Sequence, residues 1–117
     1  MTVADKLQIK AGQRVLILGA PPDVDIGVAE THEHTNADAV VLFVTAAADL
    51  TGDDADAVVG AARRDVVAWV AYPKAGQLGT DLNRDSLAAA LTARAVRPVR
   101  QISIDNVWSA LRFRPAT

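Results

Sequence analysis

The sequence predicts a single α/β domain over residues 1–117: a Rossmann-like, methyltransferase-like sheet that is mainly parallel, is flanked by helices and ends in an antiparallel hairpin. Two observations predict this class. Three continuous runs of β-branched and aliphatic residues alternate with segments of helical periodicity, which is the pattern of strands covered on both faces. Two alternating stretches separated by a turn then indicate a hairpin at the end of the chain.

The predicted parallel strands are Arg14–Leu18, Ala39–Val44 and Val66–Tyr72. The first strand follows a short helical turn over Val3–Ile9 and ends at Gly19, before two prolines that cannot continue a ladder. Residues 23–38 have no clear pattern, and either a short helix or a weak edge strand fits them. Without a covering strand there, Arg14–Leu18 is an apolar sheet edge, so we expect a homodimer.

Two longer helices are predicted between and after these strands. The first follows Thr51–Asp54, where small polar and acidic residues suit a helix N-terminus, and it presents Ala55, Val58, Val59 and Ala62 on one face. The second begins at Thr80–Asp81, ends before Pro98, and has an apolar stripe of Leu82, Leu87, Ala90 and Leu91. The closing hairpin is Val99–Phe113, with its turn at Asp105–Asn106.

Charge is unevenly distributed along the chain, although the net charge is only −2. Residues 20–65 hold ten acidic residues against Arg63 and Arg64, whereas residues 66–117 hold seven bases against three acids. Such regions can attract each other within one fold or between copies, or they can simply be solvated faces. Cysteine is absent, which excludes disulfides, thiol nucleophiles and thiolate metal sites.

Several motifs resemble a small bacterial family of unknown function. The matching segments are Lys6–Pro21, Tyr72–Lys74, Thr80–Asp85 and Asp105–Phe113, which together leave out mainly residues 23–38. The resemblance implies a trimmed methyltransferase-type sheet with an early strand, later parallel strands and a closing antiparallel hairpin. It implies no activity, because the family has none assigned.

The first candidate site lies where parallel strands end, because ligands of open α/β sheets bind at their carboxyl ends. The residues expected to meet at this rim are Lys74, Thr80, Asp81, Arg84, Asp105 and Trp108. Lys74 and Arg84 beside a helix N-terminus would suit a small anionic ligand. The alternative is structural: a helix cap, a local ion pair and a packed tryptophan.

Three other sequence patterns give weaker indications of a binding site. The turn after the first strand has only Gly19 and two prolines, which is a poor nucleotide-binding turn. His32 and His34 could share a metal, but they are the only histidines and too few ligands for a zinc centre, so no metal site is predicted. A basic set near the C-terminus, with Trp108 nearby in sequence, could grip phosphates: Arg94, Arg97, Arg100, Arg112 and Arg114. The pI of about 5.5 argues against a nucleic-acid binder.

The sequence therefore predicts a non-enzymatic binding or interaction module for a small anionic ligand or a protein partner, with no cofactor. No serine elbow or placed histidine supports hydrolytic chemistry. The alternatives are a degenerate enzyme using S-adenosylmethionine and a structural partner protein with a charge-split surface. No apolar run is long enough for a membrane span and no secretory start is evident, so we expect a cytoplasmic protein.

Overall fold

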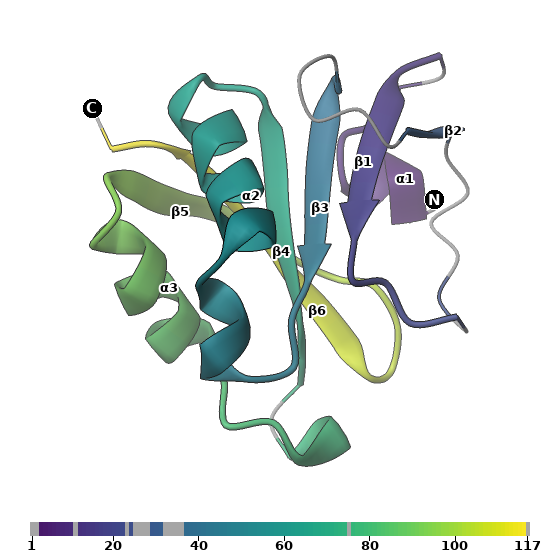
Figure 1. Cartoon of the computed structure of the whole chain (residues 1–117). Helices are drawn as coiled ribbons and strands as arrows, with labels where there is room; N and C mark the ends of the chain where they lie inside the picture. Colours follow the sequence, from purple (N-terminus) through teal and green to yellow (C-terminus); the bar gives the residue numbers. More distant parts are fainter. Residues whose placement is uncertain are drawn as a thin grey trace.

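The computed structural model describes residues 3–10, 12–22, 24, 29–31, 37–74 and 76–116. Its elements in chain order are α1 (Val3–Lys6), β1 (Arg14–Leu18), β2 (Ala29–Thr31), β3 (Ala39–Phe43), η1 (Ala47–Leu50), α2 (Asp53–Arg63), β4 (Val67–Pro73), η2 (Gln77–Gly79), α3 (Arg84–Thr92), β5 (Val96–Ser103) and β6 (Trp108–Pro115) (Figure 1). The three predicted parallel strands and the closing hairpin are all present, because runs of branched aliphatic residues specify buried strands locally.

The strands form one sheet in the order β2-β1-β3-β4-β6-β5. The first four strands are parallel, β6 runs antiparallel to β4, and β5 runs antiparallel to β6. β1 lies between β2 and β3, so it is not the sheet edge that we expected. β5 is an edge strand, which explains why it can include Pro98 instead of starting after it.

The predicted helix-flanked, Rossmann-like and methyltransferase-like arrangement is wrong. The β4–β6–β5 half of the sheet is antiparallel, and the described residues form only three α-helices, of 4, 11 and 9 residues. In the described part of the chain, both α2 and α3 pack on one face of the sheet (Figure 1). The opposite face is covered by the four-residue α1 with the residues after it, and by the turn between β5 and β6. A strand that is apolar on both faces has the same sequence pattern whether a helix or a loop covers each face. The pattern therefore could not show which face the helices cover.

Two apolar clusters fill the two faces. On the helix face, Val58, Val59 and Leu87 pack against β3, β4 and β6. On the other face Leu7 and Trp69 are fully buried, and the Trp69 indole Nε1 donates a 2.8 Å hydrogen bond to the Leu7 carbonyl. This bond fastens the N-terminal segment across the back of the sheet and satisfies a buried donor.

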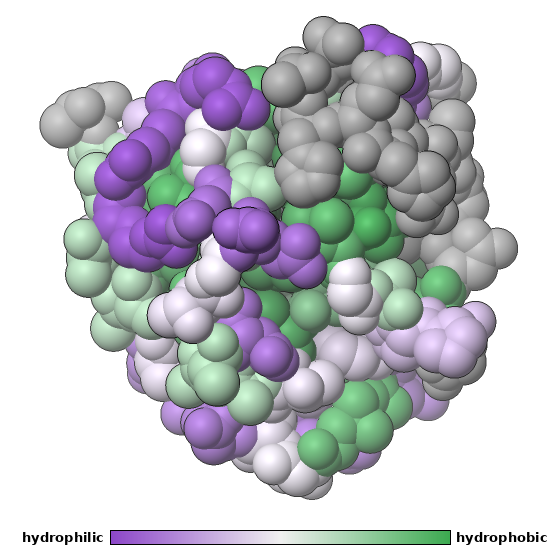
Figure 2. Space-filling model, viewed as in Figure 1, coloured by the Kyte–Doolittle hydropathy of each residue, from purple (hydrophilic) through white to green (hydrophobic). Residues whose placement is uncertain are grey.

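The chain is compact, with a radius of gyration of 12.8 Å, as expected for a domain of this length. Within the described ranges, no helix has the length and apolar character needed to cross a bilayer. Viewed from the helix side, hydrophilic side chains gather over α2, and apolar surface shows between them (Figure 2).

Candidate functional site

Thr80 and Asp81 connect the loop before α3 to the segment after β3. The Thr80 hydroxyl donates to the Thr45 carbonyl at 2.7 Å, and the Ala47 amide donates to Asp81 Oδ1 at 2.9 Å. Both side chains therefore bridge segments 34 or 35 residues apart in the chain. Neither is the N-cap that we predicted for the second long helix, because Asn83 caps α3 through a capping box with Ser86.

Lys74, Asp105 and Trp108 meet at the start of the β6 strand. The Lys74 ammonium donates to Ser103 Oγ at 2.8 Å, and the Lys74 amide donates to the Val107 carbonyl at 2.7 Å. Asp105 Oδ1 accepts from the amides of Val107 and Trp108, which closes the hairpin turn. Trp108 is only 4% exposed, so its ring belongs to the core.

The structure thus divides the predicted rim residues into two groups. Thr80 and Asp81 lie beside Thr45, whereas Lys74, Asp105 and Trp108 lie at the hairpin. Arg84 is exposed in the first turn of α3, 3.8 Å from Asp85. Sequence reasoning overlooked Leu78 in the connecting loop, which is 60% exposed with a φ of 53°. An exposed leucine in a polar loop has no sequence signal that separates it from a buried one.

An open depression of about 520 Å³ lies at the carboxyl ends of β1 and β3, in front of the first turn of α2. It is lined by Gly19, Leu42, Phe43, Thr45, Ala48, Asp49, Thr51, Asp53 and Asp54. Its three carboxylates and two hydroxyls suit a cationic or hydroxylated ligand better than an anionic one. The position is where open α/β sheets bind ligands, but its charge opposes the anionic ligand predicted for the strand ends.

Metal ligation finds no support in the described ranges, where no three His, Cys, Asp or Glu side chains lie together in a way that could hold an ion. His32 and His34 lie outside the described residues. Asp49, one of the acids that line the depression, accepts hydrogen bonds from the backbone amides of Thr45 and Ala46. Its carboxylate therefore stabilises a turn of the chain. These donors lower the pKa of Asp49, with burial acting in the opposite direction.

Four arginines lie on one face of the β5–β6 hairpin, and we call this set the arginine face: Arg97, Arg100, Arg112 and Arg114. Arg97 pairs with Arg114 across the strands, and Arg100 pairs with Arg112, so each pair projects to the same side. Arg97 and Arg100 are three residues apart and would face opposite sides of a regular strand. The register shift between Pro98 and Arg100 brings them to one side.

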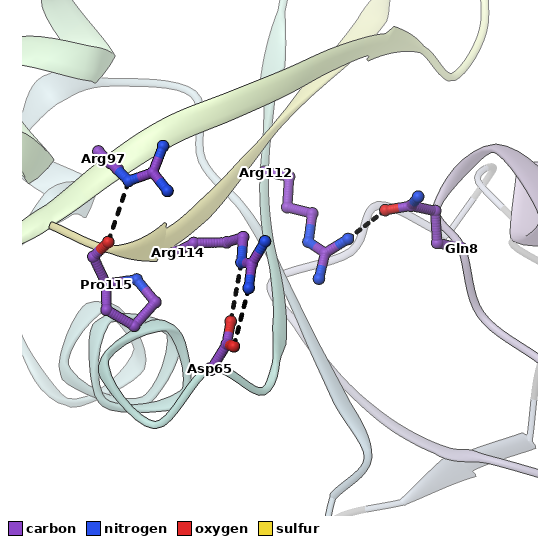
Figure 3. Close-up of polar contacts among 6 residues, drawn as sticks. All are labelled: Gln8, Asp65, Arg97, Arg112, Arg114 and Pro115. Atoms are coloured by element: carbon purple, nitrogen blue, oxygen red, sulfur yellow. Dashed lines mark hydrogen bonds and ion pairs between the residues drawn. The ribbon is translucent and has the colours of Figure 1, made fainter. Parts of the chain in front are cut away.

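The arginine face lies on the side of the sheet away from α2 and α3, because Arg112 pairs with Trp69 of the opposite cluster. Figure 3 shows Arg97, Arg114 and Arg112 in a row, with Gln8 reaching Arg112 from the N-terminal segment. Arg114 Nε and Nη2 donate to the two carboxylate oxygens of Asp65, each at 2.9 Å. Arg97 Nε donates to the Pro115 carbonyl at 3.1 Å, and Arg112 Nη1 donates to Gln8 Oε1.

Positive charge on this face is only partly neutralised. Asp65 is the one carboxylate in the described chain that forms an ion pair with it, and the paired guanidinium holds the pKa of Asp65 below its ordinary value. Burial, followed by the charge of Arg114, lowers the pKa of Arg112. Arg112 Nε is buried without a hydrogen-bond partner among the described atoms. The Arg100 side chain is exposed and forms no hydrogen bond or ion pair with another described residue, so its guanidinium group is open to another molecule.

Two of the residues that the sequence grouped as a basic, phosphate-binding set near the C-terminus, Arg94 and Trp108, do not belong to the arginine face. Arg94 lies on the helix side, where its Nη2 is 2.6 Å from Asp56 Oδ1, so it does not join the arginine face. Trp108 packs edge-on against Phe43 in the core, with ring centres 5.1 Å apart, so it offers no stacking surface. What remains is a compact group of four guanidinium side chains, next to which the described chain offers no exposed aromatic ring, because the neighbouring Trp69 is fully buried.

No protein-family model and no curated protein matches this chain. The resemblance to a bacterial family of unknown function therefore stays a prediction.

Proposed function

We propose that this chain is a binding module that holds an anionic partner on the arginine face. The observation that carries the proposal is the strand register, which sets Arg97 beside Arg114 and Arg100 beside Arg112 on one side of the sheet. The four guanidinium groups repel one another, and only one described carboxylate forms an ion pair with them. A bound anion would reduce this electrostatic repulsion. Arginine is suited to this task because its planar donors match carboxylate and phosphate oxygens.

The face also meets the physical requirements of recognition better than the strand-end rim does. Arg100 is exposed, so an incoming anion reaches its guanidinium group without displacing existing structure. At the rim, the polar groups of Thr80, Asp81 and Asp105 already hold backbone groups of the fold. Removing them from those contacts to bind a ligand would leave amides unsatisfied.

A second candidate rests on the depression at the ends of β1 and β3. With the helix-flanked sheet overturned, an enzyme using S-adenosylmethionine is favoured only by this hollow and its carboxylates, which suit a hydroxylated, cationic ligand. Phe43 lines the hollow and contacts Trp108, so ligand entry would change Trp108 fluorescence.

The test is calorimetric titration of the full chain with tripolyphosphate at low ionic strength, using Arg100→Gln and Arg63→Gln as a charge-matched pair. Arg63 lies on α2, on the other side of the sheet. Arg100→Gln should weaken binding about fivefold to tenfold, because one charge-assisted contact is lost. Arg63→Gln should leave the affinity within about twofold, because Arg63 lies on the helix side of the sheet and no charge-assisted hydrogen bond to an anion on the arginine face is lost.

Other outcomes separate the alternatives. If Lys74→Ala with Arg84→Ala abolishes binding and Arg100→Gln does not, the anion site is the strand-end rim and our proposal is wrong. If tripolyphosphate does not bind, while S-adenosylmethionine changes Trp108 fluorescence in the wild type and not in Trp108→Phe, the depression is the site.

A further inference from the structure

The arginine face has a regular spacing. Arg112 and Arg114 are two residues apart on β6, which places their Cα atoms about 6.6 Å apart. Arg100 and Arg97 stand opposite them on β5, so the four side chains form a two-by-two array. Alternate side chains of any extended peptide repeat at the same distance, about 6.6 Å. Acidic residues at every second position of an extended segment would therefore meet successive arginine pairs.

The groups that already touch this face are planar oxygen acceptors. Arg114 holds the Asp65 carboxylate in a two-bond fork, Arg112 holds the Gln8 carboxamide, and Arg97 holds the Pro115 carbonyl. A side-chain carboxylate of a partner offers the same planar geometry and adds charge, which makes the hydrogen bonds stronger. A partner carboxylate therefore suits this face, where it can exchange with these internal acceptors or reach the exposed Arg100 directly.

Nucleic acid fits the same face less well. Proteins that hold single strands usually stack bases on exposed aromatic rings. Trp69 and Trp108, the aromatic residues of β4 and β6 on this side of the sheet, are at most 4% exposed. The whole chain is also acidic, with a net charge of −2, so a polyanion that extends beyond the four arginines meets repulsion.

We infer that the arginine face binds an extended acidic segment of a partner protein, with Asp or Glu at alternating positions along the hairpin. The segment lies across the face and does not extend the sheet, because Pro98 and the adjacent register shift interrupt the free edge of β5. This inference rests on the proposed function, since it names the partner of the same anion-binding surface.

The experiment compares two fluorescent peptides of identical composition and charge. One alternates Glu and Thr, and the other carries the same glutamates in one block followed by the threonines. Anisotropy titration with the full chain at low ionic strength should show the alternating peptide binding about fivefold tighter, because each carboxylate then reaches its own arginine. Arg100→Gln should remove most of this difference, and the control Arg63→Gln should keep it.

Each of the other outcomes would contradict the inference, and each shows whether the proposed anion-binding function fails as well. Equal affinity of the two peptides means that charge alone is recognised, which overturns the spacing and leaves the proposed function standing. Tighter binding of an oligothymidylate with the same number of charges identifies the partner as nucleic acid. If tripolyphosphate binds and neither peptide does, only the peptide inference fails. If none of these probes binds, the proposed function fails with it.

Discussion

Asp49 is a single carboxylate that organises the turn between β3 and η1. Its Oδ2 accepts the Thr45 amide at 3.0 Å, the Ala46 amide at 3.2 Å and the Thr45 hydroxyl at 3.3 Å. Loop amides that face away from a strand need an acceptor, and a short acidic side chain supplies one locally. Polar residues that look like ligands in a sequence often serve the backbone in this way, as Thr80 and Asp105 also do.

This carboxylate predicts a pH dependence of stability. The pKa of Asp49 is lowered in the folded chain, so its stabilising contribution is present above the unfolded value of about 3.8 and is lost as the pH falls through the folded value. Asp49→Asn should reduce the free energy of unfolding at pH 7 by roughly 0.5–1 kcal/mol, a modest figure because the group is solvent-screened. Urea denaturation at pH 7 and at about pH 2.5 measures the change.

At about pH 2.5 the wild type and Asp49→Asn should differ less, because this pH lies below the unfolded value of about 3.8, where protonation of Asp49 increasingly favours the unfolded chain. A stability gap that is constant over this range would show that ionisation of Asp49 contributes nothing.

At the scale of elements, the exit of β1 is packed tightly against the end of β3. Gly19 has a φ of 72°, and a Cβ added there would lie 2.8 Å from the Phe43 carbonyl oxygen. Gly12, just before β1, has a similar φ of 85° but nothing within 4 Å of its added Cβ. Substitutions at Gly12 and Gly19 therefore distinguish the cost of backbone strain alone from the added cost of a steric clash between two strands.

We expect Gly12→Ala to lower the free energy of unfolding by about 1 kcal/mol, through its left-handed backbone alone. Gly19→Ala should lose at least about 1 kcal/mol more, because the carbonyl contact adds to the same strain. Chemical denaturation of both variants makes the comparison. Equal losses would mean that the β1–β3 junction relaxes freely around a methyl group.

At the scale of the whole molecule, opposite charges are held apart. Asp53 and Asp54 begin α2 beside the strand-end depression, whereas Asp65, which pairs with the arginine face, follows the end of that helix. Eleven helical residues separate these ends by about 16 Å. A molecule with separate acidic and basic regions can pair with a second copy of itself.

We therefore keep the homodimer as a prediction, now based on charge instead of on an exposed β1. Sedimentation equilibrium at micromolar concentration should give a higher mean mass at low salt than at about 0.5 M salt, where surface charges are screened. Arg100→Gln should shift the low-salt mass toward the monomer. A monomer under all these conditions would contradict self-association.

Local features of the chain were predictable because they depend on neighbouring residues. Runs such as Ala39–Phe43 specified strands, and the spacing of Ala55, Val58, Val59 and Ala62 specified the buried face of α2. The cap of α3 was placed too early, because Thr80 and Asp81 have the composition of a cap but bind the distant Thr45 and Ala47. The basic set was visible in the sequence, but its members could not be sorted by face.

The amino-acid sequence by itself determined which segments became strands and helices, because burial periodicity is a property of consecutive residues. Only the tertiary structure decided that α2 and α3 cover the same side, since strands with two apolar faces accept either a helix or a loop. It also decided that Arg97 and Arg100 point the same way. That outcome depends on a one-residue register shift against β6, and pairing between strands is not encoded in either strand alone.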